Sequence, residues 1–213
     1  MKGPSLSSYI DYTLLRPGCT REEIGALCDT AIQRGYAAVC VPPYFVSDAA
    51  KRLEGTSVVV ATVVGFPHGM HLTETKAEEA RLALAMGAKE LDMVINLAAY
   101  FSGDERYVRA ELQHLIELAH AHSALLKVIL ETALLSPSQI QELCRWAAEA
   151  GADFVKTSTG FAAKGAELEV VKLMRSSVPD SMGVKASGGI RTAEAAWAFI
   201  QAGANRIGTS TAL

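Results

Sequence analysis

The chain has 213 residues, 50% of them apolar and 20% charged, which favours a single soluble domain spanning residues 1–213. A net charge of −3 predicts no nucleic-acid partner and no anionic-membrane partner. No apolar run approaches the roughly 20 residues that span a bilayer, and the first five residues do not resemble a signal peptide. Four cysteines without a CxxC pair argue against a zinc site or a disulfide framework, so we expect a cytoplasmic protein without a metal.

Apolar, strand-like segments alternate with amphipathic, helix-like segments along the whole chain. Most of the strand-like segments are unbroken apolar runs, which is typical of parallel strands buried on both faces. In chain order they are residues 9–14, 38–41, 58–64, 90–95, 125–130, 154–157, 183–186 and 206–208. Between them, Thr20 with Glu23 and Ser136 with Gln139 have the spacing of helix capping boxes. Eight strands interleaved with helices predict either a doubly wound sheet or a closed (β/α)8 barrel.

A repeated glycine favours the barrel. At four places a glycine follows a helical pattern and precedes a strand, the position of a left-handed helix cap. These glycines are Gly35, Gly87, Gly151 and Gly203. The residues five positions further on are Cys40, Asp92, Lys156 and Gly208. Three of these four residues are polar, reactive or conformationally special. Capping explains the glycines in any α/β protein, but the constant offset suggests that the four residues share a height near the carboxyl ends of the strands, where the active site of a barrel lies. We therefore predict a single TIM barrel, with no helix after the eighth strand.

Two lysines and an aspartate stand inside apolar strand segments. Lys156 and Lys185 lie in consecutive strands, and Asp92 lies two strands before Lys156. An unpaired charge in a dry interior is costly, so such residues need partners or shifted pKa values. A purely structural interpretation is an ion pair of Asp92 with one lysine, while the other lysine extends to solvent. Two lysines on adjacent strands beside an acid favour the catalytic interpretation instead.

The catalytic interpretation is a Schiff-base nucleophile. A lysine amine with its usual pKa of about 10.4 is protonated at neutral pH and cannot attack a carbonyl carbon. Burial and a second cation nearby both lower that pKa and activate the amine. One lysine would then attack, the other would tune its pKa, and Asp92 would carry protons to and from the bound carbinolamine.

Two glycine-containing loops predict a phosphate site. Gly188 and Gly189 follow the seventh strand and open a helix, and Gly208 and Ser210 lie in the segment that follows the eighth strand. Loops after strands seven and eight are the usual phosphate site of this barrel, with glycine N–H groups as donors. Gly160, which lies shortly after Lys156, adds a third wall, so we expect a phosphorylated substrate.

Seven segments together resemble the deoxyribose-phosphate aldolases over nearly the whole chain. They are residues 10–15 (IDYTLL), 63–67 (VVGFP), 92–96 (DMVIN), 127–132 (KVILET), 154–161 (FVKTSTGF), 184–191 (VKASGGIR) and 206–210 (RIGTS). The segments around the two lysines are highly specific together. The resemblance implies a class I aldolase, a lyase without a cofactor. It would interconvert 2-deoxy-D-ribose 5-phosphate with acetaldehyde and D-glyceraldehyde 3-phosphate, in deoxyribonucleotide catabolism.

The resemblance also implies roles for individual positions. Lys156 forms the Schiff base, Lys185 perturbs its pKa, and Asp92 belongs to the proton relay. Residues at phosphate-binding positions of the family are Gly160, Gly188, Gly189, Gly208 and Ser210. Asp11 and Thr13 match positions that face the sugar end of the site. The family pattern implies no metal, and it implies a homo-oligomer, either a dimer or a tetramer.

Some positions depart from the family pattern, and two alternatives stay open. Tyr12, Arg16 and Phe101 replace residues that are frequent in the family, but none of them touches the three catalytic positions. One alternative is a Schiff-base barrel that acts on a different phosphosugar. The other is a phosphate-binding barrel without catalytic activity, against which the retention of both lysines and Asp92 argues.

Overall fold

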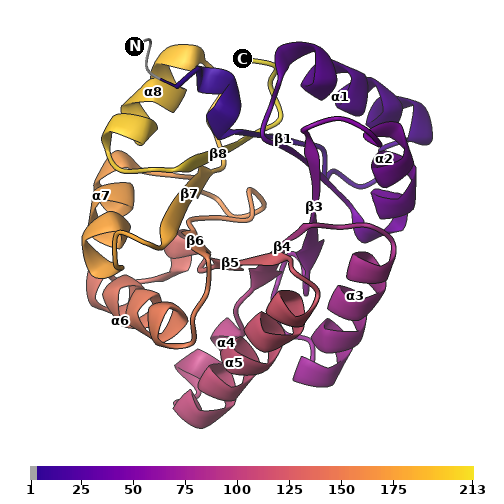
Figure 1. Cartoon of the computed structure of the whole chain (residues 1–213). Helices are drawn as coiled ribbons and strands as arrows, with labels where there is room; N and C mark the ends of the chain where they lie inside the picture. The colour runs from indigo at the N-terminus through magenta and orange to yellow at the C-terminus, as the bar shows by residue number, and fades with distance from the viewer. Residues whose placement is uncertain (1–3) are drawn as a thin grey trace.

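The eight strands form one closed parallel barrel in sequential order, as predicted (Figure 1). The structure is a computed structural model that describes residues 4–213. The prediction that the first five residues are not a signal peptide falls mostly on residues 1–3, which lie outside the described residues. The strands are β1 (Ile10–Thr13), β2 (Ala38–Val41), β3 (Val59–Val64), β4 (Glu90–Val94), β5 (Leu125–Ile129), β6 (Phe154–Lys156), β7 (Gly183–Ser187) and β8 (Arg206–Thr209). Their bounds differ from the expected ones by at most one residue at either end.

Helices surround the barrel on its outside (Figure 1). The α-helices are α1 (Arg21–Arg34), α2 (Val46–Arg52), α3 (Thr73–Ala85), α4 (Leu97–Phe101), α5 (Glu105–Ala121), α6 (Pro137–Glu149), α7 (Leu168–Ser177) and α8 (Ala193–Gln201). Three short 3-10 helices are η1 (Leu6–Tyr9), η2 (Pro43–Phe45) and η3 (Thr132–Leu134). Both α4 and α5 follow β4, and residues 210–213 after β8 contain no helix. Among residues 4–213, no helix combines the length and the hydropathy that crossing a membrane requires.

Local signals in the sequence account for the helix ends. Both predicted capping boxes form, at Thr20 before α1 and at Ser136 before α6, so at each helix start the N–H groups of the N-cap residue and of the third helical residue are paired. The four repeated glycines all have positive φ, between 65° at Gly35 and 110° at Gly87, in the conformation that ends a helix before a strand.

The register of the strands decides which side chains fill the barrel. Asp92 pairs with Lys127, and Lys156 pairs with Lys185, on neighbouring strands. With the stagger of an eight-stranded barrel, inward-pointing residues of alternate strands form layers of four. From the amino ends of the strands upward, the layers are Ala38, Glu90, Phe154 and Arg206; Asp11, Ala61, Lys127 and Lys185; and Cys40, Asp92, Lys156 and Gly208. The upper layer is the set of residues that follow the repeated glycines by five positions.

The interior of the barrel has an apolar part and a charged part. On the side of β2 and β3, Ala38, Cys40, Ala61 and Val63 form a small apolar cluster of their own. The outward-facing residues of the strands pack against the helices in a separate and much larger apolar core. The charged part of the interior therefore lies among β1 and β4 to β8, directly beneath the carboxyl ends of those strands.

Candidate active site

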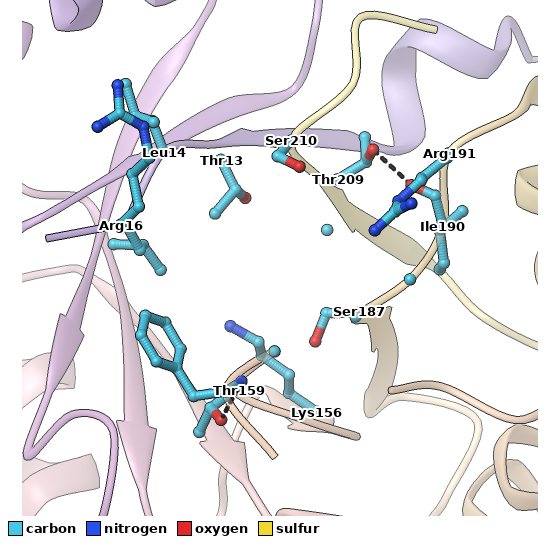
Figure 2. A pocket seen from close by; sticks show the side chains of 16 residues that line it. Thr13, Leu14, Arg16, Lys156, Thr159, Ser187, Ile190, Arg191, Thr209 and Ser210 are labelled. Carbon is cyan, nitrogen blue, oxygen red and sulfur yellow. Dashed lines mark hydrogen bonds between the residues drawn. The ribbon is translucent and has the colours of Figure 1, made fainter. Parts of the chain in front are cut away.

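A pocket of about 360 Å³ opens at the carboxyl ends of the strands (Figure 2). The segments that follow β1, β6, β7 and β8 enclose it. The residues that line it are Thr13, Leu14, Leu15, Arg16, Lys156, Thr159, Gly160, Phe161, Ser187, Gly188, Gly189, Ile190, Arg191, Gly208, Thr209 and Ser210. This is the end of the barrel at which the active site was expected.

Lys156 is the one lysine that lines this pocket among residues 4–213, and its amino group points into it (Figure 2). Its residue is only 3% exposed, and its Nζ lies 2.6 Å from Asp92 Oδ2. Lys185 is fully buried below the pocket, and its Nζ lies 2.7 Å from the same Asp92 oxygen. The two nitrogens are thus no further apart than twice that distance, within the range of about 6 Å at which like charges strongly shift a pKa.

The environment drives the pKa values of the two lysines in opposite directions. Burial is the main cause that lowers the pKa of Lys156; the Asp92 carboxylate opposes it, and the positive charge of Lys185 lowers that pKa further. Burial also disfavours the charged form of Lys185, but Asp11 and Asp92 outweigh it and raise its pKa. Lys156 is therefore the group that can supply a free amine, while Lys185 stays a cation.

Asp92 connects these groups. Its burial would raise its pKa, but Lys127, Lys156 and Lys185 hold that pKa well below its usual range. Oδ1 accepts a hydrogen bond of 2.9 Å from Lys127, which leaves Oδ2 to the other two lysines. Asp92 is thus an ionised proton acceptor within hydrogen-bond distance of the pocket lysine.

Most of the residues assigned to substrate binding line the pocket. Those that do are Thr13, Gly160, Gly188, Gly189, Gly208 and Ser210. Asp11 does not line it: its carboxylate is fully buried beneath the pocket and accepts hydrogen bonds from Lys185 and Arg206. Although burial opposes this, these two cations and Lys127 lower the pKa of Asp11. The structure therefore places Asp11 with the buried charged groups and apart from the binding loops.

The glycines after β7 bring backbone close to the pocket. Gly188 and Gly189 have φ of 92° and 82°, a conformation that residues with a side chain rarely adopt. The Ala166 N–H donates to Gly188 O at 3.1 Å, so the loops after β6 and β7 support each other. The chain then enters α8, and Arg16 and Arg191 add positive charge at the rim (Figure 2). Such a combination suits an anionic group.

Four residues near the site were not among the predicted site residues. Lys127, Glu90 and Arg206 extend the charged cluster below Asp92. Glu131 has φ of 54°, and its carboxylate accepts hydrogen bonds from the Thr159 N–H and hydroxyl, which holds the loop after β6 in place. The sequence held a signal for Glu90 and Arg206, because they lie two residues before Asp92 and Gly208 in the same strands, where alternate side chains share a face. Lys127 lies in β5, which contains no predicted site residue, and its signal was a charge inside an apolar run.

Comparisons with known proteins agree on one family. The sequence pattern of the DeoC/LacD family aldolases matches residues 7–212. A deoxyribose-phosphate aldolase of Thermococcus gammatolerans is 53% identical over 213 residues, covering 99% of this chain and 95% of the relative. One of Aciduliprofundum boonei is 50% identical over 210 residues, with the same coverage.

Solved structures give the same result. A structure described as QR15, an aldolase, superposes with a TM-score of 0.92 at 43% identity, covering 97% of this chain and 92% of the other. The tetrameric deoxyribose phosphate aldolase of Aeropyrum pernix superposes with a TM-score of 0.91 at 38% identity, covering 97% and 87%.

Proposed function

The chain belongs to the DeoC/LacD family of aldolases, and on that basis we propose that it is a class I aldolase that cleaves 2-deoxy-D-ribose 5-phosphate to acetaldehyde and D-glyceraldehyde 3-phosphate. The position of Lys156 is the observation that supports the class I mechanism. Its amine reaches the pocket, with Asp92 Oδ2 at 2.6 Å and the buried Lys185 beside it.

The reaction begins with the free amine of Lys156. It adds to the aldehyde carbon of the sugar to give a carbinolamine, which loses water to form a protonated Schiff base. Removal of the proton from the C3 hydroxyl breaks the C2–C3 bond, D-glyceraldehyde 3-phosphate leaves, and the electron pair forms an enamine on the lysine. Protonation of the enamine and hydrolysis then release acetaldehyde. Asp92 and Lys185, which share a hydrogen bond, relay the protons.

The glycine loops after β6, β7 and β8 bind the phosphate. Backbone N–H groups at Gly188, Gly189 and Ser210 are the donors, as at helix N-termini and other anion sites built from backbone. Thr13 faces the sugar. A phosphate held at this rim would place the aldehyde end deeper in the pocket, toward Lys156 (Figure 2).

The biological setting follows from the family. We place the enzyme, as a single aldolase domain, in the cytoplasm and in deoxyribonucleotide catabolism, with phosphosugar and aldehyde as its substrates and without a nucleic-acid or membrane partner. We also propose a homo-oligomer, a dimer or a tetramer; one similar protein, the Aeropyrum pernix aldolase, is described as a tetramer. Light scattering of the purified protein measures this directly, and a monomer at all concentrations would refute it.

The test of the proposed function combines turnover with covalent trapping. The purified protein should cleave deoxyribose 5-phosphate, and borohydride with acetaldehyde should attach a reduced two-carbon adduct to Lys156, located by peptide mass mapping. Lys156→Ala should lose both the adduct and the turnover. An adduct on Lys185, or turnover that survives Lys156→Ala, would contradict the assignment. Turnover of another phosphosugar in place of deoxyribose 5-phosphate would indicate a different aldolase.

A further inference from the structure

The interior of this barrel holds seven charged side chains, although barrel interiors are usually filled by branched apolar residues. Three are carboxylates: Asp11, Glu90 and Asp92. Four are bases: Lys127, Lys156, Lys185 and Arg206. Six of the seven side chains are at most 5% exposed, and that of Arg206 is 14% exposed.

Hydrogen bonds join these groups into one closed network. Lys127 Nζ lies 2.5 Å from Glu90 Oε2 and 2.9 Å from Asp92 Oδ1. On the far side of the barrel, Arg206 donates to both Glu90 and Asp11. Lys185 then connects Asp11 back to Asp92. Each carboxylate is therefore shared between at least two bases.

The charges of the network balance only in one protonation state. The three carboxylates are offset by Lys127, Lys185 and Arg206, each of which pairs with at least two carboxylates. If Lys156 is neutral, the sum is zero; if it is protonated, one positive charge is left over in a buried volume. An uncompensated buried charge is costly, so the network as a whole disfavours the protonated form.

We propose that Lys127, Glu90 and Arg206 are positioning residues that act on Lys156 through Asp92 and keep its amine in the free form. Lys127 occupies Asp92 Oδ1 and offsets much of its charge, which would otherwise stabilise a protonated Lys156. Glu90 restrains Lys127 from below, and Arg206 neutralises Glu90 and Asp11 together. The pKa shift of Asp92 agrees with this, because after burial Lys127 is the strongest influence on it, ahead of either of the other lysines.

The other groups around Lys156 do not alter this balance. Cys40 on β2 has its pKa raised to about 11, chiefly by burial, so its thiol is neutral at physiological pH. The carboxylate of Glu131, after β5, accepts a hydrogen bond from the Thr159 N–H. Within residues 4–213, no ion pair joins Glu131 to the network. Ser187 on β7 is uncharged and donates to Ser158 O. At the rim, Arg16 pairs with Glu23 and is half exposed to solvent.

This inference rests on the proposed role of Lys156 as the nucleophile, and its test uses charge changes of opposite sign. Lys127→Met removes a positive charge, so the pKa of Lys156 should rise and the acid limb of the pH profile should move to higher pH. Glu90→Gln removes a negative charge, so the acid limb should move to lower pH. Lys127 lies one layer and Glu90 two layers below Lys156 in a buried site, and we expect each shift to be on the order of one pH unit. Arg206→Met should move the limb in the same direction as Lys127→Met, by less.

The double variant separates charge from damage to the fold. Lys127→Met with Glu90→Gln restores neutrality, so its acid limb should return close to that of the wild type, which structural disruption would not achieve. The readouts are the pH dependence of kcat/KM for deoxyribose 5-phosphate and of the rate of acetaldehyde trapping on Lys156. The matched control is the exposed pair of Lys172 and Glu169 on α7, whose Met and Gln variants should leave the profile unchanged.

The outcomes distinguish this inference from the proposed function. If the wild type shows no trapping on Lys156, the proposed function itself fails. If the wild type is trapped but both single variants keep its acid limb, or shift it in the same direction, the positioning role is refuted. If circular dichroism shows that a single variant does not fold, the double variant provides the test. An acid limb of the double variant that is displaced from that of the wild type would refute the proposal that charge balance sets the pKa of Lys156.

Discussion

At the residue scale, two lysines on neighbouring strands have different chemistry because their partners differ. Lys185 forms ion pairs with Asp11 and Asp92 and stays charged. Within residues 4–213, Lys156 forms an ion pair with Asp92 alone, and the positive charge of Lys185 lowers its pKa. The same carboxylate oxygen thus receives one permanent cation and one group that can lose its proton. Identical residue types acquire separate roles from one difference in their neighbours.

Replacement of Lys185 should reveal this dependence in the pH profile. Lys185→Leu deletes the cation, so the pKa of Lys156 should rise toward its ordinary value. Since the free amine is present only above that pKa, activity at pH 7 should fall about tenfold for each unit of rise and should partly recover as the pH increases. Recovery should be incomplete, because Lys185 is also proposed to relay protons with Asp92. The check is the pH dependence of kcat/KM.

Lys185→Arg provides the control, because it keeps the positive charge. Its acid limb should stay near that of the wild type even if its turnover falls. A Lys185→Leu enzyme with unchanged activity and an unchanged profile would overturn the role of this residue.

At the element scale, the loop between β7 and α8 depends on two consecutive glycines with positive φ. A Cβ at Gly189 would meet no atom within 4 Å, so a side chain there would project into open space at the pocket that Gly189 lines. A Cβ at Gly188 would approach Gly165 Cα to 2.8 Å and force the neighbouring loop away. Gly189 is therefore the position at which the proposed phosphate binding can be perturbed with the least damage to the loop packing.

Gly189→Val should raise the KM for deoxyribose 5-phosphate much more than the KM for deoxyribose. The branched side chain should occupy the phosphate position and twist the local N–H groups, and we expect a change of about tenfold or more, as for the loss of one charge-assisted hydrogen bond. Steady-state kinetics with both sugars measure it. Gly55→Val, which has a similar φ of 75° in the turn between α2 and β3, controls for backbone strain. Equal losses with both sugars would contradict a phosphate site here.

At the scale of the whole molecule, the buried carboxylates already have cationic partners. Asp11, Glu90 and Asp92 are each paired with lysine or arginine side chains, and the upper layer offers an amine as the reactive group. A chelator such as EDTA at millimolar concentration should therefore leave the rate of deoxyribose 5-phosphate cleavage unchanged. Loss of activity that zinc restores would identify a metal-dependent aldolase and would exclude the Schiff-base proposal.

Much of this protein could be derived from its sequence, because the relevant signals are local. Unbroken apolar runs gave the eight strands, capping boxes gave the starts of α1 and α6, and the repeated glycines marked the loops before four strands. Short-range backbone geometry sets both the helix cap and the loop that leads from it to the strand. A constant number of residues between the cap and a strand position therefore places that position at a constant height in the fold. The upper layer of the barrel, with Asp92 and Lys156, followed from that offset.

Only the tertiary structure decided how the buried charges are shared. Which lysine reaches the pocket depends on the stagger of the closed barrel, and the sequence does not state that stagger. The same is true of Asp11, which belongs to a segment beside the binding loops but pairs inside the barrel with Lys185 of β7 and Arg206 of β8. The network of Lys127, Glu90 and Arg206 joins strands separated by more than 100 residues. Electrostatic coupling depends on distance in space and on burial, and for these residues the closure of the barrel sets both.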